Sequence, residues 1–243
     1  MSWYPVLYMQ MIKKQWVMAL IGTVVVVGVG FGGWYYVSHR VAPFPINSTD
    51  TISSWTFKGV YTGNDTLIAQ AAADVEKLTA LLGTGEYDDY DLYIGMGNDA
   101  NLIGDGKTAY QAYNKAISIH PSKGLAYANL AHLMDQLGAY STAADAYAQA
   151  VAVESPQLEY HVERLNYLTR QFPGDQEQLL AAFTDAHTQF GDMPAILAIK
   201  AQWLSAGGHY TEAIEVWQTV KVLSPTERKA SIDAEIARLK KKQ

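Results

Sequence analysis

The sequence predicts an all-α protein in which one transmembrane helix precedes a stack of helical hairpins. Two observations carry this prediction: an uncharged apolar run near the N-terminus, and a set of small and aromatic residues that recurs about every 34 residues. The composition is that of a globular protein, because 49% of the 243 residues are hydrophobic and 17% are charged. The absence of cysteine excludes disulfides, thiol catalysis and cysteine-ligated metals.

The apolar run extends from Trp16 to Val37 and contains no charged side chain. As a helix it would reach about 33 Å, which matches the hydrocarbon thickness of a bilayer. A cleaved signal peptide is the alternative, but the length of the run and the lack of a small-residue cleavage motif favour a retained anchor. The sequence therefore predicts a transmembrane helix over residues 16–37.

The residues around this helix predict its orientation. Lys13 and Lys14 lie in a short N-terminal segment, residues 1–15, that is apolar enough to rest in the membrane interface. The positive-inside tendency places this segment in the cytoplasm and the rest of the chain outside it. We therefore expect a single-pass protein of the cytoplasmic (inner) membrane, with Gly28 and Gly32 allowing close contact with another helix.

Residues 38–65 are rich in Pro, Ser, Thr, Asn and Gly and show no helical period, which predicts a linker. A short strand over residues 55–61 is one option within it. A helix is expected next, over residues 66–82, and Gly83 would end it.

A repeat begins after this helix. Its marker residues are Gly97, Gly104, Ala109, Tyr113 and Ala116, which return 34 positions later as Ala131, Gly138, Ala143, Tyr147 and Ala150. They return again 70 positions later as Ala201, Gly208, Ala213, Trp217 and Val220. Since 70 is 34 + 36, the unit between must hold two extra residues. Leu179, Phe183 and Ala186 mark the second helix of that unit, whereas its first helix, 157–171, lacks the markers.

This pattern resembles the tetratricopeptide repeat (TPR) family, whose unit is a helix-turn-helix. The resemblance implies a TPR α-solenoid within residues 66–243, with repeats at 90–123, 124–157, 158–193 and 194–227. The expected helix pairs are 89–102 with 105–118, 123–136 with 139–153, 157–171 with 175–189, and 193–206 with 209–222. A capping helix over residues 226–242 would carry Ile232, Ile236 and Leu239 on one face.

In TPR domains the first helices of the units line a concave groove. The resemblance implies that ten residues line it here: Ile94, Asn98, Asn101, Leu125, Asn129, His132, Asp135, Gln136, Gln202 and Ser205. This set is polar and nearly uncharged, and asparagine amides can pair with an extended peptide backbone. A peptide, a partner's helix and a larger protein surface all remain candidate ligands.

Two of these residues, Asn98 and Asn129, match the asparagines that chaperone-binding TPR members use to clamp a terminal carboxylate. Those members also need a lysine where this chain has Ile94. Without that cation a carboxylate clamp is not expected.

Nothing in the sequence points to catalysis. No two of the six histidines stand four residues apart, and there is no nucleophile elbow, phosphate loop or dinucleotide fingerprint. The net charge of -6 disfavours nucleic acid as a partner. We therefore expect no enzyme activity, no metal site and no cofactor.

The main functional hypothesis is a membrane-anchored scaffold that binds a protein or peptide partner outside the cytoplasm. The last unit is also similar to the TPR subunit of the bacterial cytochrome c haem-ligation machinery, through Ala213, Ile214, Trp217 and Val220. That similarity implies a partner in apocytochrome c. A third hypothesis is a structural subunit of an envelope secretion or pilus assembly.

Overall fold

The computed structural model describes residues 43–243. Their helices are α2 (Asp65–Leu81), α3 (Asp89–Ile103), α4 (Gly106–Ile119), α5 (Gly124–Gln136), α6 (Tyr140–Val153), α7 (Leu158–Gln171), α8 (Gln176–Phe190), α9 (Pro194–Ala206), α10 (Tyr210–Leu223) and α11 (Thr226–Lys240). The predicted transmembrane helix over residues 16–37, its flanking segment 1–15 and the Gly28 and Gly32 pair lie outside the described residues. Within 43–243, none of the helices combines the length and the apolar character that a membrane span requires.

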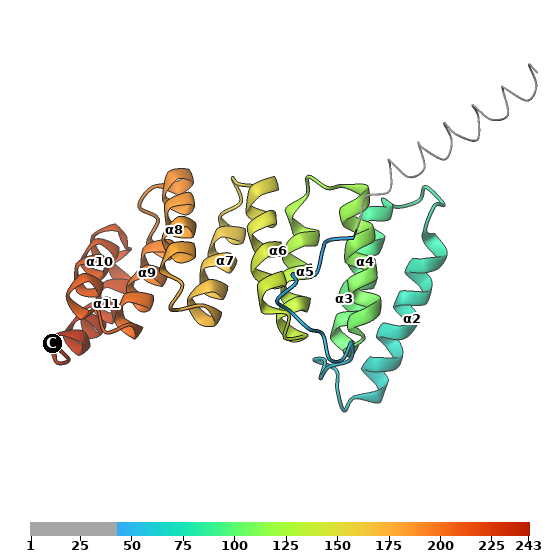
Figure 1. The fold of residues 1–243 in the computed structure, drawn as a ribbon, viewed down its shortest axis with the longest axis horizontal. Helices are drawn as coiled ribbons and strands as arrows, with labels where there is room; N and C mark the ends of the chain where they lie inside the picture. The colour runs from blue at the N-terminus through green and yellow to red at the C-terminus, as the bar shows by residue number, and fades with distance from the viewer. Residues whose placement is uncertain (1–42) are drawn as a thin grey trace, which may run out of the picture. The chain divides into compact units, whose positions relative to one another are not determined.

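The described helices form one row of hairpins, from α2 at one end to α11 at the other (Figure 1). From α3 onwards, consecutive helices are joined by turns of two to four residues. Such short turns keep neighbouring helices packed against each other. The predicted all-α fold of four helix pairs followed by a final helix is confirmed.

The two extra residues of the third unit occupy its first helix and the turn that follows. Helix α7 has 14 residues where α5 has 13. The turn 172–175 then has four residues where the turn 137–139 has three. The longer turn contacts the next unit, because Trp203 Nε1 on α9 donates a hydrogen bond of 2.9 Å to the carbonyl oxygen of Pro173.

Small residues let the two helices of a hairpin approach each other. A Cβ atom added to Gly97 on α3 would lie 2.3 Å from the ring of Tyr113 on α4, so only glycine fits this contact. Ala131 and Ala201 occupy the same position in later units and are fully buried. The aromatic residues also link units, since the rings of Tyr147 and Tyr167 are 5.0 Å apart.

The last helix closes the apolar end of the row. Ile232, Ile236 and Leu239 of α11 are buried in one cluster with Trp217 and other residues of α9 and α10. This is the face that the sequence predicted. A terminal helix of this kind removes apolar surface that a further repeat would otherwise cover.

The segment before α2 differs from the expected linker. Residues 43–61, which we call the strap, pack against the hairpins, and Phe44, Ile52, Trp55 and Phe57 touch the core. Figure 1 shows the strap running across α4, α5 and α6. The strand expected over 55–61 is reduced to a single antiparallel bridge between Thr56 and Asp105.

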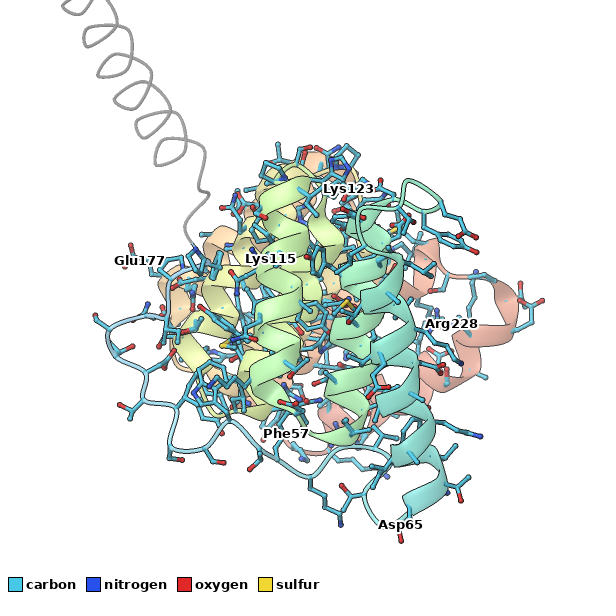
Figure 2. All side chains as sticks on the ribbon, turned by 90° about the vertical axis from the view of Figure 1, so that its right-hand side faces the viewer. Phe57, Asp65, Lys115, Lys123, Glu177 and Arg228 are labelled. Atoms are coloured by element: carbon cyan, nitrogen blue, oxygen red, sulfur yellow. The ribbon has the colours of Figure 1, made fainter. Side chains whose placement is uncertain are left out.

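Backbone pairing holds the end of the strap at the turn between α3 and α4. Phe57 N donates to the carbonyl oxygen of Gly104 at 3.2 Å, and Gly106 N donates to that of Trp55 at 2.8 Å. Gly104 has a φ of 84°, and a Cβ atom there would lie 2.1 Å from the carbonyl oxygen of Phe57. Seen from the α2 end of the row, Phe57 lies beside this turn (Figure 2). Gly104, a marker residue of the repeat, therefore also allows the backbone of the strap to pack closely against this turn.

An acidic side chain of the strap caps helix α6. The N-cap residue of α6 is Ala139, which has no side-chain acceptor. Asp50 of the strap supplies the missing acceptor. The carboxylate of Asp50 accepts hydrogen bonds from Ser141 N at 3.2 Å and from Thr142 N at 2.6 Å. It also accepts from Thr142 Oγ1 at 2.7 Å. Capping of this kind satisfies backbone N–H groups that the helix itself leaves unpaired.

We predict that Asp50→Ala lowers the free energy of unfolding by about 1 kcal/mol, the usual cost of removing an N-cap acceptor. Urea unfolding followed by far-UV circular dichroism measures this loss. The control is Ser53→Ala, at an exposed strap position, which should leave stability unchanged. Equal stability of the two variants would show that the strap is not anchored through Asp50.

Candidate functional site

Four exposed hydrogen-bonding side chains occupy corresponding positions on the first helices of the four units. They are Asn98 on α3, His132 on α5, Asn166 on α7 and Gln202 on α9. We call this set the polar row. Successive members are separated by 34, 34 and 36 residues, which is the spacing of the units themselves. Stacking of the units therefore repeats one surface position along the array.

At the first position of the row, hydrogen bonds fix the amide of Asn98. Its Oδ1 accepts from the Tyr113 hydroxyl at 2.9 Å and from Asn129 Nδ2 at 3.1 Å. Tyr113 is buried, with 2% of its surface exposed, so Asn98 satisfies a hydroxyl group that water hardly reaches. The Nδ2 group of Asn98 remains at the surface as a donor.

The imidazole of His132 joins two units at the second position. Its Nδ1 lies 3.1 Å from the hydroxyl of Tyr147, and its Nε2 lies 3.7 Å from Oε1 of Glu163 on α7. The edge of the imidazole also packs on the Tyr147 ring, with 5.5 Å between centroids. These contacts hold the ring in one orientation at the surface.

A second link between α5 and α7 lies beside His132. Asp135 accepts from Arg170 and also from Gln171 Nε2, the latter at 2.9 Å. Arg170 lies over the ring of Tyr167, with its guanidinium carbon 5.7 Å from the ring centroid. Because Asp135 is paired in this way, its charge is largely offset, and the surface stays close to neutral.

The tyrosines below the row remain protonated at neutral pH. Burial raises the pKa of Tyr113 and of Tyr147 well above the ordinary value of a phenol, and nearby carboxylates add to the effect. The hydroxyl of Tyr113 therefore donates to Asn98, and the hydroxyl of Tyr147 forms a hydrogen bond with Nδ1 of His132. Protonated tyrosines thus support both side chains from below.

The ten residues predicted to line the groove fall into three groups. Leu125, His132, Gln136, Asn98 and Gln202 are exposed, whereas Asn101, Asn129, Asp135 and Ser205 are half-buried. Ile94 is the exception, because it is only 8% exposed and belongs to the hydrophobic core. Its apolar side chain is used for packing and offers a ligand almost no surface.

The structure adds three residues that the sequence reasoning missed: Glu163, Asn166 and Arg170, all on α7. They were missed because the first helix of the third unit lacks the small marker residues, so its residues were not counted among the groove positions. A signal did exist, since Asn166 stands 34 positions after His132. Counting from the preceding unit would have placed it in the row.

The described residues contain no arrangement for metal chemistry. Within 43–243, no three His, Asp or Glu side chains are close enough to one another to hold a metal ion.

Comparison with known proteins identifies the fold. No protein-family model matches the chain, and no curated protein matches it. The crystal structure of MamA is similar over 72% of this chain and 95% of its own, with a TM-score of 0.51 and 13% sequence identity. The fold is a TPR-type helical repeat. A second structure, that of MamA AMB-1, gives a TM-score of 0.47 and 15% identity over 67% of this chain and 92% of its own.

The residues behind the resemblance to the haem-ligation subunit are Ala213, Ile214, Trp217 and Val220, and all four are buried. Because these residues are buried, they show how α10 packs and do not indicate which partner is bound.

We predict that Asn98→Ala lowers the free energy of unfolding by about 1 kcal/mol, because the buried hydroxyl of Tyr113 loses its acceptor. Adding Tyr113→Phe should remove most of this extra cost, so the two substitutions would be non-additive in a urea-unfolding cycle. Gln202→Ala, at the exposed fourth position of the row, is the control and should change stability by less than about 0.5 kcal/mol. Additive effects would contradict a structural role for Asn98.

Proposed function

We propose that this protein is a membrane-anchored TPR scaffold that binds a protein partner along the polar row, on the extracytoplasmic side of the cytoplasmic membrane. The observation that carries the proposal is the polar row itself. It presents exposed amide and imidazole groups at one repeated position on the first helices of four successive units. A repeated row of this kind suits a partner that extends along several units.

The chemistry of the row favours an extended peptide as the ligand. Asn166 and Gln202 carry amides that both donate and accept hydrogen bonds, as a peptide backbone does, and Asn98 adds its Nδ2 donor. Beside the row, Asp135 and Arg170 form an ion pair, and Oε1 of Glu163 lies 3.7 Å from Nε2 of His132. We expect hydrogen bonds to the peptide backbone to contribute most to recognition.

The anchoring part of the proposal rests on the sequence. The run from Trp16 to Val37 is uncharged and of membrane-spanning length, and Lys13 and Lys14 precede it. Attachment to a membrane confines the scaffold and a membrane-associated partner to the same surface. Their effective concentration rises, so modest affinity at the row is enough for assembly.

A photo-crosslinking residue tests the proposal in cells that express the full chain. Placed at Asn166, it should give an adduct of one reproducible mass that stays in the membrane fraction after an alkaline carbonate wash. Gln202→Arg should abolish this adduct, because the bulky cation blocks the neighbouring position of the row. The same crosslinker at Gln111, an exposed position on α4, should not give it.

The proposal has two parts, the binding surface and the membrane anchor, and each can be contradicted separately. An adduct that also forms at Gln111, or that survives Gln202→Arg, would show that the partner does not bind along the row. An adduct that the carbonate wash releases would contradict the membrane anchor and leave the binding surface in place.

A further inference from the structure

The strap shows what kind of ligand the surface formed by α4, α5 and α6 accepts. Phe44 lies against Tyr127 of α5, with 5.9 Å between ring centroids, and its backbone N–H and carbonyl pair with Asn114 and Tyr110 of α4. Further along, Trp55 packs on Tyr110 at 5.1 Å. An extended segment therefore fills the space between α4, α5 and α6, using aromatic side chains and backbone hydrogen bonds.

On the other side of this space the strap binds helix α6 through polar groups. Asn47 N donates to Thr142 Oγ1 and Asn47 Nδ2 donates to Asp145 Oδ2, each at 2.9 Å. Asp50 caps the N-terminus of the same helix. The strap footprint thus consists of Tyr110 and Asn114 on α4, Tyr127 on α5, and Ser141, Thr142 and Asp145 on α6.

Helices α8, α9 and α10 hold the same places in the row two units later. Helices α5 and α9 both have 13 residues, α6 and α10 both have 14, and α8 has 15 where α4 has 14. The first residues of the three pairs of helices are each 70 positions apart. Each residue of the footprint therefore has a counterpart at the same place in its helix. The counterparts are Leu180 for Tyr110, Thr184 for Asn114, Leu197 for Tyr127, Thr211 for Ser141, Glu212 for Thr142 and Glu215 for Asp145.

In this second location the footprint is open. One hollow of about 430 Å³ is lined by Leu180, Glu212 and Glu215 among others. A second hollow of about 290 Å³ is lined by Leu180, Thr184 and Leu197. Together they border five of the six counterpart positions, and Leu180 between them is 49% exposed. We call the two hollows the open footprint.

The open footprint differs from the strap footprint in charge. Two carboxylates, Glu212 and Glu215, stand where α6 has Thr142 and Asp145. Lys200 lines both hollows, and Asp192 lines the second, so one lysine faces three carboxylates. Two histidines lie beside these carboxylates: His209 Nδ1 is 3.5 Å from Glu212, and His187 Nδ1 is 3.4 Å from Asp192. A second copy of the strap would bring Asp50 towards Glu212, and like charges at such close range repel. A segment with a cation at that position would be attracted instead.

We propose that the open footprint binds an extended segment of a partner protein that carries a large apolar side chain and a basic residue. The apolar side chain packs on Leu180 and Leu197, in the same way as Phe44 of the strap packs on Tyr127 of α5. The basic residue pairs with Glu212 and Glu215. The open footprint is lined by α8, α9 and α10, and none of the four residues of the polar row is among its lining residues.

A labelled synthetic peptide tests this inference against the full chain in detergent. The probe has the strap sequence of residues 43–58 with Asp50→Lys, and its partner probe has the unchanged sequence. Fluorescence anisotropy should show the lysine peptide binding about tenfold more tightly than the unchanged one, because attraction to two carboxylates replaces repulsion. Leu180→Arg in the full chain should weaken binding of the lysine peptide by a similar factor.

Two further variants establish where the peptide binds. Glu212→Lys with Glu215→Lys should reverse the preference, so that the unchanged peptide becomes the tighter ligand. Val222→Arg, at an apolar position on α10 that is 77% exposed and lines neither hollow, is the matched control and should leave binding unchanged. It makes the same substitution on a second helix of a unit, outside the open footprint.

Three results would overturn the inference. Failure of the lysine peptide to bind, or binding that Leu180→Arg does not weaken, would show that the open footprint is not a peptide site. A full chain whose dimer dissociates on Leu180→Arg would show that a second copy occupies it. None of these results bears on crosslinking at Asn166, so the two proposals fail separately.

Discussion

The structure depends on one packing contact, between a small residue on the first helix of a unit and an aromatic ring on the second. Gly97 and Tyr113 show it most clearly, because no Cβ atom fits between them. Close approach of the two helices buries the alanines along their contact, including Ala109 and Ala116, which have no exposed surface. Tight packing of this kind makes each hairpin a unit of fixed shape, and hairpins of fixed shape stack regularly.

Regular stacking has two consequences for function. It repeats one position of the first helices, and so builds the polar row from Asn98 to Gln202. It also repeats the space between the second helices, which the strap fills at α4 to α6 and leaves open at α8 to α10. A single packing rule therefore produces two faces with different chemistry, one of exposed hydrogen-bonding groups and one of hollows with apolar and acidic lining.

The helical part of this fold could be predicted from the sequence because its signals are periodic. Small and aromatic residues recur with the unit length, and glycines mark the turns. The boundaries expected for the hairpins therefore agree with the structure to within two residues. The same reasoning explains the error at Ile94, since a groove position defined by counting does not reveal whether an apolar side chain turns inward to the core.

The strap could not be predicted because nothing in it repeats. Its contacts join residues far apart in the chain, such as Asp50 with Thr142, through a carboxylate that meets a helix end. A turn-rich segment with a few aromatic residues predicts a linker, and only the position of α6 makes Asp50 a cap. The groove residues of the third unit were also hard to predict, because α7 has the geometry of a first helix but lacks the small marker residues.

Both surfaces rest on the geometry of the hairpin, so the contact between Gly97 and Tyr113 is the point at which to test the account. Gly97→Ala adds a methyl group 2.3 Å from a ring that also holds Asn98. Because the overlap is severe, overpacking should cost close to the upper end of its usual range, about 3 kcal/mol, while the gain in helix propensity returns about 1 kcal/mol. We therefore expect a net loss of about 2 kcal/mol in urea unfolding.

Gly174→Ala is the matched control, because a Cβ atom there meets nothing within 4 Å. It should leave the free energy of unfolding nearly unchanged. A Gly97→Ala variant as stable as the original chain, or more stable, would show that close approach of the helices is not what holds the hairpins together, and would contradict the account.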